Sequence, residues 1–389
     1  MKIKSIKQNK NLSGKKVLLR VDFNVPIKKG KILDDYKIVV QLPTIKFLLK
    51  NKCRVILMTH LSRPEAGKIT SEFSVKPLAA RAGKLLDKKI KVLGLCRDFK
   101  TGTAISKMKP GEAVMLENIR FEKGEKKNDS RLARDLAKLA DVYVLDAFAS
   151  SHREHASVVA IQKYLPSYAG LLLEKEIENL NKILSPKEPL VVILGGVKAE
   201  TRVPLIKKLY KKSSRILIGG ALANSFLVAR GFATGKSLID AKSIKIIKKI
   251  KKEKILLPVD VVVSNSRSKH ETTVKNLDEV SKGDYIFDIG PQTVRLYAGF
   301  IKNAKSIIWN GPMGMFEIGK YKHGTLALAR VIASQSSGKI FGVAGGGETI
   351  EALKLTKMTQ YIDWVSTGGG AMLSYLSGEN MPGLKKIIK

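Results

Sequence analysis

Residues 169–184, AGLLLEKEIENLNKIL, lie close to the midpoint of the 389-residue chain, with prolines on either side. Leu173, Ile177 and Leu180 recur at the spacing of one helical face, and glutamates fill the early turns, where the positive end of a helix favours them. The pattern predicts a helix over residues 169–185. This helix either joins two halves of the chain or is an ordinary amphipathic helix inside one domain. Strand–loop–helix units on both sides, in halves that are each long enough for a core, favour the joining helix.

The composition is that of a globular chain, with 44% hydrophobic and 6% aromatic residues. The start, MKIKSIKQNK, has no apolar core of a signal peptide, and no run approaches the roughly 18 apolar residues of a membrane span. The two cysteines, Cys53 and Cys96, do not form a CxxC motif, which argues against a disulfide framework and a cysteine-rich metal site. We therefore expect a soluble cytoplasmic protein with reduced thiols and no membrane partner.

The formal net charge is +37, from 71 lysine and arginine residues against 34 aspartate and glutamate residues. Such an excess is typical of proteins that bind polyanions such as nucleic acid. The lysines, however, are spread along the chain in pairs and triplets, without interleaved aromatic residues and without a helix-turn-helix or RNA-binding motif. We therefore favour solvated lysine-rich faces over a nucleic-acid surface. An attraction for small anionic substrates is compatible with both.

In the first half, each predicted strand ends at polar or basic residues. Strands are expected over 16–21, 55–59, 113–116 and 142–146, and helices over 43–50, 75–86 and 129–139. The strands are followed by Asp22, Asn24, Pro26, His60, Arg63, Asn118, Arg120, His152, Arg153 and His155. Taken singly, each arginine is more typical of a surface ion pair. Because ligands of open parallel sheets collect beyond the carboxyl ends of the strands, the repeated position predicts one crevice for a small phosphate or carboxylate compound.

The second half places glycines where the first half places arginines. Strands expected over 190–194, 216–218, 306–309 and 339–344 lead into Gly195-Gly196, Gly219-Gly220, Asn310-Gly311-Pro312 and Gly345-Gly346-Gly347, and the turn over 366–371 opens the last helix. Glycine lets backbone N–H groups approach an anion closely, and a helix N-terminus adds positive potential. One glycine pair is more often a tight turn, but several before helices, with Lys198 nearby, predict phosphate cradles.

Other nucleotide and metal motifs are absent. Residues 231–237, GFATGKS, have one residue too few between the glycines of a P-loop and follow a predicted helix, which indicates a helix C-cap and loop. No GxGxxG opens a first βα unit, so a dinucleotide-binding fold has no support. His152 and His155 lack the HExxH spacing, and we do not expect a zinc site.

Six motifs that span the whole chain resemble phosphoglycerate kinase. In order, they are VLLRVDFNVP at 17–26, MTHLSRP at 58–64, LENIRF at 116–121, DVYVLDAF at 141–148, WNGPMGMFE at 309–317 and STGGGA at 366–371. The resemblance implies an α/β fold of two doubly wound parallel-sheet lobes, separated by a deep cleft. It implies an N-terminal phosphoglycerate-binding lobe of residues 1–168 completed by the tail 377–389, a hinge helix over 169–185, and a C-terminal nucleotide-binding lobe of residues 186–376.

The implied reaction is reversible phosphoryl transfer from 1,3-bisphosphoglycerate to Mg-ADP, which gives 3-phosphoglycerate and ATP. The resemblance thus implies Mg²⁺, ATP or ADP as co-substrate, and a monomer. In the ATP-consuming direction the nucleophile is a carboxylate, which is ionised near neutral pH, so no general base is required. Alignment and charge neutralisation are then the tasks of the enzyme, with closure about the hinge to bring the two substrates together.

The resemblance assigns roles position by position. Catalytic roles fall to Lys37, Lys198, Arg202 and Gly369. Phosphoglycerate binding falls to Asp22, Phe23, Asn24, Lys37, His60, Leu61, Ser62, Arg63, Arg120 and Arg153. Nucleotide binding falls to Gly195, Gly196, Lys198, Arg202, Gly219, Gly220, Asn310, Pro312, Glu317, Gly346, Gly347, Glu348 and Thr349, and Glu348 is also assigned to the metal.

Five positions depart from the family pattern. Lys37 stands in DDYKI where the family has an arginine, Arg202 where a lysine is usual, and Glu348 where an aspartate is usual. Ile286 and Ser62 occupy positions that are usually glycine. A lysine offers a point charge and not a bidentate fork, so these changes leave two hypotheses. We favour an active kinase with an altered clamp on the transferring group over a weakly active or inactive relative that binds nucleotide, phosphoglycerate or nucleic acid.

Overall fold

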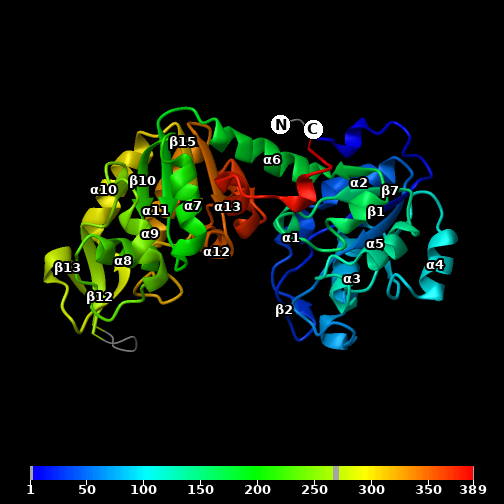
Figure 1. The fold of residues 1–389 in the computed structure, drawn as a ribbon, viewed down its shortest axis with the longest axis horizontal. Coiled ribbons are helices and arrows are strands. Elements are labelled where there is room, and N and C mark those ends of the chain that lie inside the picture. Colours follow the sequence, from blue (N-terminus) through cyan, green and yellow to red (C-terminus); the bar gives the residue numbers. More distant parts are fainter. Residues whose placement is uncertain (1–2, 266–270, 389) are drawn as a thin grey trace. The chain divides into compact units, whose positions relative to one another are not determined.

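The computed structural model describes residues 3–265 and 271–388, and the chain divides into two compact units. Unit 1 comprises residues 1–177 and 380–389, and unit 2 comprises residues 178–379. Each unit is built around its own six-stranded sheet, in which neighbouring strands are parallel (Figure 1). The predicted α/β class with two parallel sheets is confirmed.

The sheet of unit 1 has the strand order β5-β6-β4-β1-β7-β8. Its strands are β1 (Lys16–Arg20), β4 (Arg54–Met58), β5 (Lys91–Val92), β6 (Ala113–Met115), β7 (Val142–Leu145) and β8 (Ser167–Ala169). The helices are α1 (Tyr36–Val39), α2 (Leu42–Lys50), α3 (Lys76–Leu86), α4 (Phe99–Ser106) and α5 (Ser130–Ala137), and a small hairpin joins β2 (Ile27–Lys28) to β3 (Lys31–Ile32). The inner strands read as near-continuous apolar runs because helices cover both faces of a parallel sheet.

Helices α2 and α3 supply the apolar residues that cover one face of this sheet. Ile45 and Leu48 on α2, and Leu78 and Ala82 on α3, are completely buried. They pack in one cluster with Leu19 and other inward residues of the central strands. Their helical spacing is what the sequence pattern predicted, while the short strands β5 and β8 and helix α4 were not predicted.

The C-terminal tail packs against the start of the chain within unit 1. Ile3 and Ile388 form an antiparallel bridge, and the Lys4 N–H donates to the Ile387 carbonyl at 2.7 Å. The buried Gln162 amide donates to the Gly383 carbonyl at 2.7 Å. Residues 380–389 therefore belong to the first unit although they follow the second in sequence.

The sheet of unit 2 has the strand order β11-β10-β9-β15-β16-β17. Its strands are β9 (Leu190–Leu194), β10 (Ser213–Ile218), β11 (Ile255–Leu256), β15 (Ser306–Asn310), β16 (Phe341–Gly345) and β17 (Trp364–Ser366). The helices are α7 (Ala199–Leu209), α8 (Gly220–Ala229), α9 (Ile244–Lys248), α10 (Pro291–Lys302), α11 (His323–Ser336), α12 (Gly347–Leu355) and α13 (Gly369–Ser377). All four strands predicted in this half are present, and α7, α8, α12 and α13 begin directly after glycine-containing turns.

A three-stranded antiparallel sheet completes unit 2. It has the order β13-β12-β14 and consists of β12 (Asp260–Ser264), β13 (Thr273–Asn276) and β14 (Tyr285–Ile289). The sequence pattern did not predict this sheet. Strand β14 packs beside α8 and α11, so this small sheet supplies one side of the space above the parallel sheet.

Helix α6 (Leu171–Leu184) begins at a buried carboxylate. Asp146, which follows β7, accepts hydrogen bonds from the N–H groups of Leu172 (2.9 Å) and Leu173 (3.0 Å). A Cβ at Gly170 would lie 2.2 Å from the Asp146 carboxylate, which explains the glycine before the helix. Burial raises the pKa of Asp146 to about 6, against the opposing effect of these hydrogen bonds. The residues of α6 are divided between the two units.

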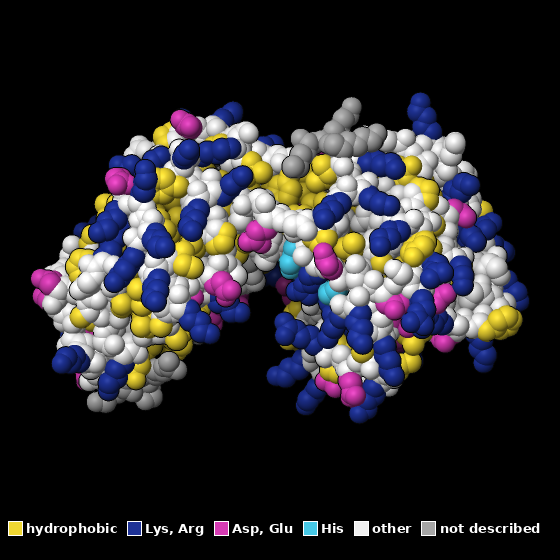
Figure 2. Space-filling model, viewed as in Figure 1, with side chains coloured by type: hydrophobic (Ala, Val, Ile, Leu, Met, Phe, Trp, Pro, Cys, Tyr) yellow, Lys and Arg dark blue, Asp and Glu magenta, His cyan; other side chains and the backbone are white. Residues whose placement is uncertain are grey.

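Lysine and arginine side chains are spread over the visible face of both units, interspersed with other side chains (Figure 2). This distribution agrees with the predicted solvated faces. Cys53 and Cys96 are both free and buried. Within residues 3–265 and 271–388, the structure contains no helix that is long and apolar enough to cross a membrane.

Candidate active site

Unit 1 carries a basic pocket at the carboxyl ends of its central strands. Its cavity of about 570 Å³ is lined by Asn24, Val25, Pro26, His60, Ser62, Arg63, Arg120, Lys126 and Arg153. Six of these were predicted as ligands of phosphoglycerate, and they come from the loops after β1, β4, β6 and β7. Lys126 was not predicted. Four cationic side chains in one cavity fit a small anion with phosphate or carboxylate groups.

Hydrogen bonds between the loops hold this pocket together. The Asn24 side chain accepts from the Ser62 N–H at 2.9 Å. Asn118, after β6, accepts from the Leu61 N–H (3.1 Å) and donates to the Leu61 carbonyl (2.9 Å). Ser62 has a φ of 55°, a left-handed conformation that explains why glycine suits this position. Phe23 and Leu61 are buried and shape the loops from behind.

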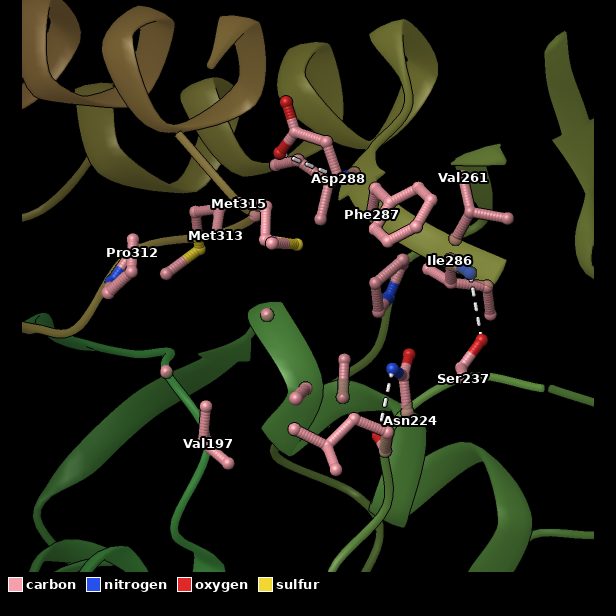
Figure 3. Close-up of a pocket in the computed structure, with 18 of the residues that line it drawn as sticks. Val197, Asn224, Ser237, Val261, Ile286, Phe287, Asp288, Pro312, Met313 and Met315 are labelled. Carbon is pink, nitrogen blue, oxygen red and sulfur yellow. Dashed lines mark hydrogen bonds between the residues drawn. The ribbon is translucent and has the colours of Figure 1, made fainter. Parts of the chain in front are cut away.

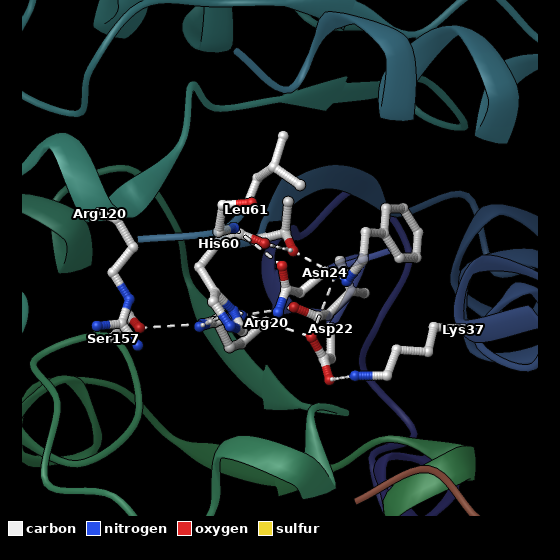
Figure 4. A network of polar contacts seen from close by, with 12 residues as sticks. Arg20, Asp22, Asn24, Lys37, His60, Leu61, Arg120 and Ser157 are labelled. Carbon is white, nitrogen blue, oxygen red and sulfur yellow. Dashed lines mark hydrogen bonds and ion pairs between the residues drawn. The ribbon is translucent and has the colours of Figure 1, made fainter. Parts of the chain in front are cut away.

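A buried polar network lies beneath the pocket and centres on Arg20, Asp22 and His60 (Figure 4). Lys37 donates from Nζ to Asp22 Oδ2 at 2.8 Å, so its ammonium is held at this network. Burial opposes ionisation of Asp22, but the charge of Lys37, the hydrogen bond from Lys37 and the charge of Arg20 outweigh it and hold the pKa below its usual value. Asp22 is therefore an anion that anchors the cations around it.

The pocket itself is electrostatically unsatisfied. The pKa of Arg120 is lowered, first by burial and then by repulsion from Arg20, Arg153 and Arg63, although Glu125 opposes this effect. Burial, followed by repulsion from Arg120, Arg20 and Arg153, lowers the pKa of His155 to about 3. A bound anion would relieve this repulsion, which gives the pocket a preference for negatively charged ligands.

Unit 2 carries a second, largely apolar pocket of about 260 Å³ (Figure 3). One end is formed by Gly196, Gly220, Pro312 and Glu348, near the turns that begin α7, α8 and α12. The other end is lined by Asn224, Leu227, Leu238, Pro258 and Tyr285, with Ile286 and Phe287 of β14 alongside. A flat apolar group such as a nucleobase fits the second end, and a charged group fits the first.

The first two glycine turns serve close packing. A Cβ at Gly195 would lie 1.9 Å from the Pro312 carbonyl oxygen, and one at Gly219 would lie 2.4 Å from Met313 Sδ. The Gly196 N–H donates to the Pro312 carbonyl (2.9 Å), and the Gly220 N–H donates to the Met313 carbonyl (2.8 Å). These two N–H groups are therefore occupied within the protein and are not donors for the predicted phosphate cradles.

The later glycine turns also lead into helices. Gly346 (φ 105°) caps α12, and Gly369 is the first residue of α13. A Cβ at Gly369 would lie 2.6 Å from Gly346 Cα, so only glycine lets the two turns meet. The first N–H groups of an α-helix have no partner inside the helix, and both turns thus present donors and positive potential.

Two charged side chains converge on the turn at Gly196. A Cβ there would lie 3.1 Å from Arg202 Nη2 and 3.7 Å from Glu348 Oε2. Burial lowers the pKa of Arg202, while Glu348 opposes this effect. Lys198 is exposed at the N-cap of α7, and Arg202 follows it on the next turn. Nε of Arg202 is buried without a hydrogen-bond partner among the described residues, which leaves donor capacity for a ligand.

Polar atoms inside the second pocket are mostly occupied. Thr349 Oγ1 accepts from the Gly311 N–H at 2.7 Å, and Asp288 accepts from the N–H groups of Gly324 (2.7 Å) and Ile289 (2.9 Å). Burial raises the pKa of Asp288 to about 7. Asn224, 2% exposed, donates from Nδ2 to the Leu238 carbonyl at 3.2 Å, and its Oδ1 has no partner among the described residues.

The predicted nucleotide residues fall into two groups in the structure. Gly196, Gly220, Pro312, Glu317 and Glu348 line the pocket directly. Gly195, Gly219, Asn310 and Thr349 are buried behind its wall, and Lys198, Arg202, Gly346 and Gly347 lie at the adjoining helix starts. The apolar lining from α8, β14 and the loops around Leu238 and Pro258 was not predicted. Of these residues, the sequence singled out only Ile286, which stands before the Asp-Ile-Gly-Pro turn at a position that is usually glycine.

The described residues contain no group of three or more His, Cys, Asp or Glu side chains arranged to hold a metal ion. Mg²⁺ in phosphoryl-transfer sites is commonly held by one or two carboxylates together with phosphates and water. Glu348, exposed at the N-terminus of α12 and directed to the charged end of the pocket, fits such a role.

A basic pocket on one parallel sheet and a largely apolar pocket with a charged end on another fit a two-substrate α/β enzyme. The family model for phosphoglycerate kinase matches residues 6–379. The chain therefore belongs to the phosphoglycerate kinase family, as the sequence motifs predicted, and the family implies a phosphotransferase whose acceptor is a carboxyl group.

Individual relatives agree over nearly their whole lengths. The phosphoglycerate kinases of Pelotomaculum thermopropionicum and Thermosipho africanus are 41% and 43% identical to this chain, and each alignment covers 97% of it and 97% or 96% of the relative. The solved structure of the Coxiella burnetii phosphoglycerate kinase matches with a TM-score of 0.88 at 38% identity, covering 99% of both chains. The solved structure of the Pyrococcus horikoshii phosphoglycerate kinase matches with a TM-score of 0.87 at 32% identity, covering 99% of this chain and 98% of that one.

Proposed function

We propose that this chain catalyses reversible phosphoryl transfer between 1,3-bisphosphoglycerate and Mg-ADP, giving 3-phosphoglycerate and ATP. Membership of the family supports the reaction. The observation that carries the assignment of substrates is the pair of pockets, one basic and polar in unit 1 and one apolar with a charged end in unit 2.

The basic pocket binds the phosphoglycerate. Asn24, His60, Ser62, Arg63, Arg120 and Arg153 line it, with Asp22, Phe23, Leu61 and Lys37 as supports. Arginine forks suit the phosphate of this substrate, while the hydrogen-bonded loops hold its carboxylate and hydroxyl in one orientation. This division of roles is supported by the convergence of four cationic side chains on one cavity.

The apolar pocket binds the nucleotide. We place the base at the end near Asn224 and the phosphates at the end near Gly196, Arg202 and Glu348. Asn224 lies one turn into α8 beyond Gly220, so about 6 Å of helix separates the two ends. Its amide nitrogen is held by the Leu238 carbonyl, which turns the unpartnered oxygen to the other side. That oxygen accepts from the amino group of adenine, and Glu317 lines the part where the ribose would lie.

In the ATP-consuming direction, a carboxylate oxygen of 3-phosphoglycerate attacks the γ-phosphorus of ATP. The bond from that phosphorus to the bridging oxygen breaks, and ADP leaves with the electron pair. No proton transfer is needed, so Lys37, Lys198, Arg202 and the N-terminus at Gly369 act by alignment and by stabilising charge on the transferring group. Glu348, together with the phosphates, would hold Mg²⁺, which would supply further positive charge.

We further propose helix α6 as the hinge segment between the two lobes, and a cytoplasmic monomer. Light scattering on the purified protein tests the oligomeric state.

The decisive experiment is a steady-state and single-turnover assay of the purified wild type with Mg-ATP and 3-phosphoglycerate, with Lys37→Arg in parallel. Robust turnover that changes little in Lys37→Arg is expected. Binding of both ligands without turnover in the wild type, especially with recovery in Lys37→Arg, would sink the proposal and support a relative that has lost its transition-state contact.

A further inference from the structure

Arg20 occupies the centre of the network beneath the basic pocket. It is the last residue of β1 and is completely buried. Its Nε donates to Ser157 Oγ (3.0 Å), its Nη1 to the Val21 carbonyl (2.5 Å), and its Nη2 lies 3.2 Å from His60 Nδ1 (Figure 4). Its sequence context, the end of an apolar strand, predicts no role for it.

For a neutral His60 ring, the contact with Arg20 allows only one assignment of donor and acceptor. A guanidinium carries five N–H donors, has no acceptor and does not lose its proton in proteins. Nη2 must therefore donate, and His60 Nδ1 must accept. A neutral imidazole has one N–H group, so its proton lies on Nε2.

Nε2 of His60 is the atom left for a ligand. His60 lines the basic pocket, and no residue in the described part of the chain hydrogen-bonds to Nε2. We propose that Arg20 is a positioning residue that fixes His60 as the Nε2–H tautomer, so that the ring offers a hydrogen-bond donor to an anionic substrate. The identity of that substrate rests on the proposed function, whereas the tautomer does not.

The surroundings keep the ring neutral. Burial lowers the pKa of His60 to about 3, and Arg20 on β1, Arg120 after β6 and Lys37 on α1 act in the same direction. Asp22, after β1, favours the charged ring, but its carboxylate lies 3.9 Å from Nδ1 and is already bonded to Lys37 at 2.8 Å. The donor at Nε2 is therefore present throughout the neutral pH range.

Arg20 is itself held from behind. Ser157 Oγ donates to the completely buried Glu125 at 2.7 Å, which directs a lone pair of that oxygen to Arg20 Nε. Arg20 is thus the donor on both sides, toward Ser157 and Glu125 in the interior and toward His60 at the pocket. A purely structural Arg20, needed only to neutralise Asp22 and Glu125, would not determine which nitrogen of His60 carries the proton.

The first test measures the tautomer directly in the unliganded, full-length protein. Nitrogen-15 NMR of histidine-labelled protein distinguishes protonated from bare ring nitrogens. The chain has five histidines, and His60→Gln identifies the relevant signals by their loss. A bare Nδ1 and a protonated Nε2 from pH 6 to pH 8 are expected. A proton on Nδ1, or a doubly protonated ring at pH 6, would overturn the proposal.

The second test compares Arg20→Met with Ser157→Ala as a matched control. Arg20→Met should release the ring to exchange between tautomers and raise KM for 3-phosphoglycerate by about tenfold or more, with a smaller change in kcat. Ser157→Ala removes the contact behind Arg20 but retains the His60 contact, so the Nε2–H pattern should persist. A folded Arg20→Met protein with the wild-type nitrogen signals and KM would contradict the proposal.

A third comparison decides the matter if Arg20→Met does not fold. The amide nitrogen of His60→Gln reaches the position of Nε2 and keeps a donor there, whereas that of His60→Asn is shorter and lies near Nδ1. Calorimetry should find that His60→Gln binds 3-phosphoglycerate at least about tenfold more tightly than His60→Asn. Equal affinities would refute a donor at Nε2. These binding measurements do not require turnover, so failure of the kinase reaction remains distinguishable.

Discussion

Replacing Lys37 by methionine is expected to destabilise unit 1 at neutral pH. The Lys37 ammonium lies 2.8 Å from Asp22 Oδ2, and the side chains are 29% and 5% exposed. Methionine has a similar length but no charge, so the substitution leaves a buried carboxylate without its closest cation. Breaking a buried pair on one side is more costly than removing both partners.

The size of the effect follows from the geometry. Two charges at this separation interact by about 6 kcal/mol at an effective dielectric constant of about 20, before desolvation is counted. A hydrogen bond to a charged group retains about 1.5–3 kcal/mol net, and a coupling energy of about 2 kcal/mol between Lys37 and Asp22 is therefore expected. Because Asp22 has a lowered pKa in the folded protein, this contribution is present above the unfolded pKa and is lost as the pH falls through the folded value.

The positions of the two tryptophans allow unfolding of unit 1 to be distinguished from unfolding of unit 2. Trp309 and Trp364 both belong to unit 2, so tryptophan fluorescence follows that unit, while far-UV circular dichroism follows both. Urea unfolding of wild type, Lys37→Met, Asp22→Asn and the double variant gives the coupling energy at pH 7. Lys37→Arg, which keeps the charge, is the control. A coupling below about 0.5 kcal/mol, or the same loss at pH 3 as at pH 7, would refute the reasoning.

Three further substitutions probe other parts of the chain. Asn224→Leu keeps the volume but removes the acceptor in the nucleotide pocket, and it should lower the preference for ATP over ITP in kcat/KM by about tenfold; an unchanged ratio would exclude a contact with the base. Asp146→Asn should raise the melting temperature at pH 7 but not at pH 4. The buried carboxyl has a pKa of about 6, so its ionisation lowers the stability of the folded protein as the pH rises from about 4 through that value, on the order of 3 kcal/mol in total. Equal melting curves of wild type and variant at pH 7 would contradict this. Glu348→Gln should raise the Mg²⁺ concentration for half-maximal activity by about tenfold without changing KM for 3-phosphoglycerate, and an unchanged Mg²⁺ dependence would move the metal to other ligands.

The basic pocket could be predicted because topology alone determines it. In a parallel sheet, the residues after successive strands emerge at one edge, so Asn24, His60, Arg120 and Arg153 had to meet once their strands were recognised. Arg20 could not be assigned in the same way. A single arginine at the end of an apolar strand can point to solvent or into the interior, and only the positions of Ser157 and His60 decide between them.

The wall of the nucleotide pocket was missed for a different reason. Strand β13 is mostly exposed, and β12 and β14 pair around a register shift, so no regular alternation marks them in the sequence. Ile286 shows the consequence. Its N–H donates to Ser237 Oγ at 2.8 Å, and its side chain lines the pocket. From the sequence, Ile286 was notable only as a residue at a position that is usually glycine.

The glycine turns could be located from the sequence, but the sequence does not show whether their N–H groups are free. A glycine before a helix allows either a free N–H group or the close approach of another backbone, and both readings predict the same residue. At Gly196 and Gly220 the structure shows close approach of another backbone, because the carbonyls of Pro312 and Met313 accept hydrogen bonds from these N–H groups. The proposed phosphate binding in unit 2 therefore relies on helix N-termini, among them those of α12 and α13, which meet at Gly346 and Gly369, and on the cations of Lys198 and Arg202. Arg202, at a position where lysine is usual, lies at this charged end of the pocket, beside Gly196 and Glu348.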